Sequence, residues 1–168
     1  SNDWMNSSDY LNWPSGPSYL ATSAETAPPG VNTTLADDGT PYAFTTYYFM
    51  RTFTITNASK IVNMSFDIDY DDAYAVWING HFINSSNSSC DWYSHDALCY
   101  PYPHNSLIDT SEANEPIRPV TTLTPTQLSY LVDGTNNISV AIKQGSTTSS
   151  DAAFELRLFG YENQTIQE

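Results

Sequence analysis

The chain has 168 residues, enough for one ordinary domain with its own hydrophobic core. Its 19 acidic and 5 basic residues give a formal net charge of -14, which repels phosphate backbones and anionic headgroups, so we expect neither nucleic acid binding nor membrane insertion. No apolar run approaches the ~20 residues that span a bilayer, and no signal-peptide pattern opens the chain, so we expect a mature, soluble protein.

The first forty residues combine turn-forming residues with large apolar ones. Six large side chains stand among the Pro, Gly, Ser, Thr and Asn of residues 1–41, namely Trp4, Tyr10, Leu11, Trp13, Tyr19 and Leu20. The segment is too aromatic for a free linker, and its prolines favour an extended course. We expect residues 1–41 to form an extended N-terminal arm that covers either its own sandwich or another copy of the chain.

From residue 42 to residue 168 the pattern is that of a β-sandwich domain. Tyr47 to Ile55 is aromatic and β-branched, and Ile61 to Tyr70 alternates between apolar and polar residues. The expected inward set is Val62, Met64, Phe66 and Ile68, and the expected outward set is Asn63, Ser65, Asp67 and Asp69. Ala73 to Ile78 is a third strand, and Asn79-Gly80 after it predicts a tight type I′ hairpin.

A long polar excursion, residues 84–119, follows this hairpin. It holds the only cysteines, Cys90 and Cys99, and in an extracellular chain these predict a disulfide. A metal site there would need ligands beyond the loose set of Asp91, His95 and His104. The excursion also carries a cluster of aromatic residues, namely Trp92, Tyr93, Tyr100 and Tyr102. These form either a platform on which sugar rings stack or a packing surface against the chain's own sandwich.

Regular structure resumes in the last third of the chain. Thr124 to Gln127 matches a capping box with proline at the first helical position, and Gly134 lies where a helix stop belongs. Asn136 to Gln144 and Ala153 to Phe159 are expected strands, the second burying Phe154, Leu156 and Leu158 and exposing Glu155 and Arg157. Several short strands separated by turns predict an all-β, antiparallel sandwich, of which the jelly roll is one form.

Eight Asn-x-Ser/Thr sequons predict N-glycosylation and therefore an extracellular, secreted location. They are Asn6, Asn32, Asn57, Asn63, Asn84, Asn87, Asn137 and Asn163. Chance is the alternative in a chain so rich in Asn, Ser and Thr. Asn63 and Asn137 fall at outward positions of two predicted strands, so we expect both to carry glycans.

Catalytic and metal chemistry find little support in the sequence. Asp67, Asp69, Asp71 and Asp72 form the densest carboxylate cluster, which predicts either a structural calcium or a turn in which aspartates bond nearby amides. No nucleophile with a positioned base and no facing carboxylate pair has a signature, and His81, His95 and His104 are read as surface or loop residues. We expect a protein that is not an enzyme and holds no cofactor.

Three segments resemble the galactose-binding-like jelly-roll modules of secreted proteins. They are Tyr47 to Phe53, Asp71 to Gly80, and Gly134 to Phe154 with its Ser149-Ser150-Asp151 turn. The resemblance covers roughly residues 42–160 and implies a jelly-roll fold. It implies little about function, because modules of this kind bind carbohydrate, dock proteins or act as spacers. Met50, Ala141 and Lys143 depart from the family's usual residues.

Two functions remain in competition. The first is a non-catalytic structural or adhesive subunit that assembles with copies of itself into a filament, sheath or coat, held by the six large residues of the arm. The second is a carbohydrate-binding module that uses the aromatic residues of the 84–119 excursion. The arm discriminates between them, because insertion of Trp4 and Trp13 into a neighbour favours assembly, whereas packing of both on their own sandwich, with an open Trp92 platform, favours sugar binding.

Overall fold

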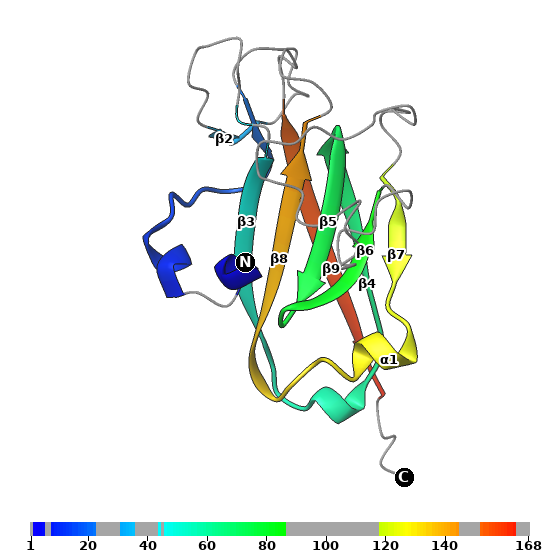
Figure 1. The fold of residues 1–168 in the computed structure, drawn as a ribbon. Coiled ribbons are helices and arrows are strands. Elements are labelled where there is room, and N and C mark those ends of the chain that lie inside the picture. Colours follow the sequence, from blue (N-terminus) through cyan, green and yellow to red (C-terminus); the bar gives the residue numbers. More distant parts are fainter. Residues whose placement is uncertain are drawn as a thin grey trace, which may run out of the picture.

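Two facing β-sheets make up the protein in a computed structural model, which describes residues 2–5, 8–22, 31–35, 44, 46–86, 118–144 and 152–163 (Figure 1). The five-stranded sheet has the order β2 (Thr33–Thr34), β1 (Leu20–Ala21), β9 (Ala153–Glu162), β4 (Ile61–Asp71) and β7 (Val120–Thr122). The four-stranded sheet has the order β3 (Thr46–Ile55), β8 (Gly134–Lys143), β5 (Ala73–Ile78) and β6 (His81–Ser85). The predicted all-β, two-sheet architecture is therefore confirmed.

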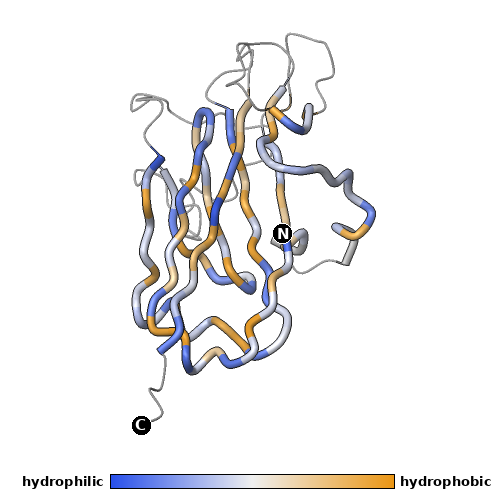
Figure 2. The backbone as a smooth tube through the Cα atoms, turned by 180° about the vertical axis from the view of Figure 1, so that it is seen from behind, coloured by the Kyte–Doolittle hydropathy of each residue, from blue (hydrophilic) through white to orange (hydrophobic). Residues whose placement is uncertain are grey.

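Alternating side chains build the core between the sheets. Phe66 and Ile68 of β4 and Ile78 of β5 are fully buried there, with Val140 and Ile142 of β8. Figure 2 shows the corresponding alternation of hydrophobic and hydrophilic residues along the strands. Leu156 and Leu158 of β9 pack against this core, as predicted from their spacing.

One residue of the predicted inward set faces water. Val62 is 54% exposed, whereas Met64 two residues on is buried. The cause is a shift in the pairing of β4 with β9 between Ile61 and Asn63, which places two successive residues of β4 on the outer face. Such a bulge inserts one extra residue and reverses the alternation that sequence reading assumes.

Short elements close the ends of the sandwich, and two of them, a short helix and the turn between β5 and β6, follow local sequence signals. The α1 helix (Pro125–Leu128) begins at Thr124, whose hydroxyl accepts from Gln127 N at 3.3 Å while Gln127 Oε1 accepts from Thr124 N at 2.9 Å. The predicted helix stop at Gly134 is wrong, because the helix ends at Leu128 and Gly134 is the first residue of β8. Asn79 and Gly80 both have positive φ, 50° and 78°, as a type I′ turn between β5 and β6 requires. A 3-10 turn, η3 (Ala58–Lys60), connects β3 to β4.

The predicted boundary at residue 42 does not separate an arm from a sandwich. Leu20 and Ala21 form β1, which pairs antiparallel with Phe154 and Ala153 of β9. Thr22 continues this attachment, since its backbone N–H donates to Ala152 O at 2.9 Å. The segment before residue 42 thus contributes two strands to the five-stranded sheet. Each is two residues long: β1 pairs with β9, and β2 pairs with β1.

Candidate functional site

The open side of the sandwich holds a cleft between the two sheets. Among the described residues, β3 is the outer strand of its sheet and has β8 as its only ladder partner. Residues 155–162 of β9 likewise pair only with β4, because β1 reaches only Ala153 and Phe154. A cleft of about 480 Å³ opens between these two strand edges. We call β3, residues 155–162 of β9 and the cleft between them the open edge.

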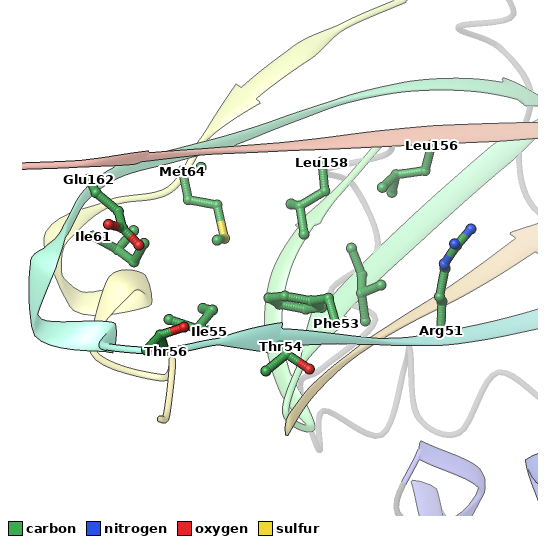
Figure 3. Close-up of a pocket in the computed structure, with 12 residues that line it drawn as sticks. Arg51, Phe53, Thr54, Ile55, Thr56, Ile61, Met64, Leu156, Leu158 and Glu162 are labelled. Atoms are coloured by element: carbon green, nitrogen blue, oxygen red, sulfur yellow. The ribbon is translucent and has the colours of Figure 1, made fainter. Parts of the chain in front are cut away.

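Apolar side chains from both sheets line the cleft. They are Phe53, Ile55, Ile61, Met64, Ile138, Leu156 and Leu158. Figure 3 shows side chains from β3 and from the opposite sheet pointing into the space between the sheets. Arg51, Thr56 and Glu162 are exposed and also line it, so the polar groups lie toward solvent. This lining suits apolar side chains entering from outside.

Gly160 leaves room at one end of the cleft. It occupies an inward position of β9, between the outward Phe159 and Tyr161, and is among the cleft-lining residues. A Cβ atom built on Gly160 would meet only the Met64 Cε atom, at 3.5 Å, which is ordinary van der Waals contact. A Cβ atom at this position would therefore be accommodated without striking the backbone.

The N-terminal aromatic residues pack on the outer face of the four-stranded sheet. The η1 turn (Asn2–Met5) buries Met5 against Ala75, Trp77 and Ala141, and its Trp4 packs on the same cluster. The Trp4 ring lies 4.5 Å from the Tyr48 ring and 5.8 Å from the Trp77 ring, measured between centroids. This end of the chain lies over the sheet in Figure 1.

The remaining residues of the expected assembly arm divide between packed and exposed. In and just after η2 (Ser8–Asn12), Trp13 stacks on Trp4 with centroids 6.4 Å apart, whereas Leu11 is 72% exposed. Tyr10 and Tyr19 are half-buried, and Leu20 packs against the core from β1. Two of the six large arm residues, Trp4 and Leu20, therefore pack on the chain's own sheets, which is one of the two courses expected for the arm. Contact of the arm with another copy stays a prediction.

A network of ion pairs covers the outer face of the five-stranded sheet. Arg157 of β9 donates to both carboxylate oxygens of Asp67, with Nη2 to Oδ2 at 2.7 Å and Nε to Oδ1 at 2.8 Å. Arg118 lies 3.2 Å from Asp69 and also donates to Glu155. Asp67 is only 7% exposed although its strand position faces outward, because the arginine side chains lie over it.

This network bears on the calcium hypothesis. Asp67 and Asp69 of the predicted carboxylate cluster are engaged with arginines, which favours the structural role over cation binding. Within the described ranges, no group of three or more His, Cys, Asp and Glu side chains is placed so that it could hold a metal ion. Burial and the nearby Asp69 carboxylate raise the pKa of Tyr19, at the margin of the same face, to about 12.

The predicted glycosylation sites differ in exposure. Three described sequon asparagines are exposed, namely Asn32, Asn63 and Asn163, and three are half-buried, namely Asn57, Asn84 and Asn137. Asn137 occupies an outward position of β8 as expected, but its Oδ1 atom is buried, so free projection into solvent is not observed. The side chain of Asn57 caps η3 by accepting from Ser59 N at 3.1 Å.

Several predicted site residues lie outside the described residues. They are Asn6, Asn87, the Cys90 and Cys99 pair, the Trp92, Tyr93, Tyr100 and Tyr102 platform, and His95 and His104. The disulfide and the sugar platform therefore stay predictions. The part of the chain that the structure describes has no helix long and apolar enough to cross a bilayer.

Sequence comparison finds no relative: neither a protein-family model nor a curated protein matches the chain. Structural comparison finds partial similarity to α-L-rhamnosidases. The Streptomyces avermitilis enzyme, solved with L-rhamnose, has a TM-score of 0.45 and 18% identity over 70% of this chain. The enzymes from Dictyoglumus thermophilum and Aspergillus terreus have TM-scores of 0.43 and 0.44, with 17% and 16% identity over 86% and 76% of this chain. This chain spans only 9%, 13% and 14% of the respective enzyme chains.

Proposed function

We propose that this domain is a galactose-binding-like jelly-roll module that serves as a non-catalytic, extracellular structural or adhesive subunit, and that it assembles with copies of itself through the open edge. The observation that carries the proposal is the apolar cleft of about 480 Å³ between two strand edges that lack a second ladder partner among the described residues. The arm, whose Trp4 packs on its own sheet, is not the docking element in this proposal.

Strand addition is the binding mode that fits the open edge. A strand edge offers a row of backbone N–H and C=O groups, and natural proteins normally cover or blunt such edges. An extended segment from a second copy can pair with β9 at Leu156 to Glu162 while every second side chain enters the cleft. Main-chain hydrogen bonds then supply affinity and the cleft supplies specificity.

The chemistry of the cleft favours a polypeptide over a reacting substrate. Its lining is mainly aliphatic and aromatic, and its ionisable members are Arg51 and Glu162. Acid–base or nucleophilic catalysis needs convergent groups that these two do not supply. Cleft residues such as Ile55 and Met64 instead match the alternating apolar side chains of a strand.

The sharpest test fills the cleft without disturbing the fold. Gly160→Val places a side chain where only Met64 Cε is near, and removes a glycine from a strand, so the variant should remain folded. Thr52→Val is the matched control, because it adds a valine at an exposed position of β3 outside the cleft lining. Sedimentation velocity should show concentration-dependent association for the parent and for Thr52→Val, and a monomer for Gly160→Val.

Two results would reject the open edge as an assembly surface. One is a parent chain that stays monomeric at high concentration, and the other is a Gly160→Val variant that associates like the parent. Capture of a foreign extended peptide by a parent chain that does not self-associate would also reject self-assembly.

Carbohydrate binding is the alternative that one observation favours. Trp4 packs on the chain's own sheet and Trp13 stacks on Trp4, which agrees with the first of the two features that the sugar-binding hypothesis requires. The second, the platform around Trp92, lies outside the described residues. In native gel electrophoresis, a polysaccharide in the gel should slow the monomeric parent chain but not the Trp92→Ala variant. This result would support the alternative.

A further inference from the structure

An apolar patch lies on the outer face of the five-stranded sheet, further along β4 and β9 from the ion-pair network. Val62, Phe159 and Tyr161 are 54%, 41% and 59% exposed. Exposed large apolar side chains that are neighbours, rather than scattered singly, usually have something that covers them. We propose that an N-linked glycan on Asn63 covers this patch, with its first sugar ring lying on the ring of Tyr161. The inference rests on the extracellular location in the proposed function.

Strand register brings the sequon and the aromatic residues together. Asn63 of β4 is the direct partner of Tyr161 of β9, and Ser65 is the direct partner of Phe159. Directly opposed residues of antiparallel strands point to the same face, with Cβ atoms roughly 4.5–5.5 Å apart. Asn63 and Ser65, the first and third residues of the sequon, therefore lie beside exposed aromatic rings.

The chemistry of the two partners is complementary. The first residue of an N-glycan, N-acetylglucosamine, has a ring face of C–H groups and an acetamide methyl group, both apolar. Tyr161 offers an apolar ring face and a polar hydroxyl that stays in water. A sugar attached to Asn63 can thus cover the ring while its own hydroxyls remain hydrated.

Asn84 provides the contrasting case. Its Nδ2 atom donates to the Tyr74 hydroxyl at 3.2 Å and to Thr121 Oγ1 at 2.7 Å. An amide nitrogen has two N–H bonds, and an N-glycan replaces one of them. The half-buried Asn84 amide has no N–H to spare, so the folded protein should carry a glycan on Asn63 and none on Asn84.

The test uses the full chain secreted from a eukaryotic host that adds N-glycans. Peptide mass spectrometry should find Asn63 glycosylated and Asn84 unmodified. Proton NMR should show nuclear Overhauser contacts between the acetamide methyl group at Asn63 and the Tyr161 ring. An unmodified Asn63, or a methyl group without contacts to the ring, would overturn the inference.

Thermal unfolding gives an independent readout. Ser65→Ala, which removes the sequon and keeps Asn63, should lower Tm by about 2–4 °C, the shift typical of one modest contact in a chain of this size. The same substitution in a Tyr161→Ser background should lower Tm far less. Asn163→Gln is the control, since it removes a predicted glycan at an exposed residue just beyond β9. An equal loss in both backgrounds would contradict the contact.

Failure of this inference is distinguishable from failure of the proposed function. The glycan contact is read on the outer face of the sheet, whereas assembly is read with Gly160→Val inside the cleft. A monomeric protein in which the Asn63 glycan contacts Tyr161 would reject only assembly, and an assembling protein in which the glycan does not contact Tyr161 would reject only the glycan contact.

Discussion

Substitution of Trp4 by alanine should destabilise the folded monomer, although sequence alone leaves open whether this residue covers its own sandwich or another copy of the chain. Replacing a fully buried Trp costs roughly 3–5 kcal/mol, and Trp4 is half-buried, so its transfer and cavity contribution is about 1.5–2.5 kcal/mol. Its ring contacts with Tyr48 and Trp77 add about 0.5–1.5 kcal/mol for a good pair. We expect a total loss of about 2–4 kcal/mol, a large part of the ~5–15 kcal/mol that stabilises a typical domain.

Urea unfolding followed by far-ultraviolet circular dichroism measures this loss, because the signal does not depend on Trp4 itself. Leu11→Ala is the matched control, since Leu11 is 72% exposed in the same segment and should change stability by less than about 0.5 kcal/mol. A Trp4→Ala variant as stable as the Leu11→Ala variant would refute the packing of this segment on the four-stranded sheet.

Two further substitutions test interior polar groups. Asn136 is 1% exposed; its side chain accepts from Asn79 Nδ2 at 2.8 Å and from Val132 N at 2.9 Å, and donates to Val132 O at 2.8 Å. Asn136→Ala removes these hydrogen bonds and should therefore lower the free energy of unfolding, measured in urea, by about 2–4 kcal/mol. A loss below about 1 kcal/mol would contradict these bonds. Burial lowers the pKa of the Lys143 ammonium from 10.5 to about 8, so the unfolded chain binds more protons between these pH values and stability rises with pH there. Lys143→Met should therefore lack this rise, so that its stability relative to the parent falls from pH 8 to 10.5, and a difference that stays constant over this range would show that Lys143 keeps an ordinary pKa.

The strands that sequence predicted well are those with a regular alternation. The inward residues Phe66 and Ile68 of β4 and Leu156 and Leu158 of β9 follow from a period of two residues, which depends only on local backbone geometry. Val62 escaped prediction because a bulge depends on the partner strand, and the partner of β4 is about ninety residues away in the chain. The capping box at Thr124 was predictable for the opposite reason, since all its atoms lie within four residues.

The open edge and the docked N-terminus depend on long-range arrangement, which a single sequence does not encode in any short pattern. Nothing local to Leu20 and Ala21 indicates that they pair with β9, and the pairing stops after two residues, leaving Leu156 to Glu162 without a second partner among the described residues. The aromatic residues of the arm were an available signal, but they indicate only that something is covered. Which sheet Trp4 covers follows from the positions of Tyr48 and Trp77 on the same outer face of two strands that are distant in the sequence.

Hydrogen exchange of the assembled protein tests the open edge most directly. Peptides that cover residues 156–162 of β9 should exchange quickly in dilute monomer and gain protection at concentrations where the parent associates, because an added strand engages their free N–H groups. The Gly160→Val variant should show no such gain at any concentration. Protection that does not change with concentration, or that rises equally in Gly160→Val, would contradict strand addition at the open edge.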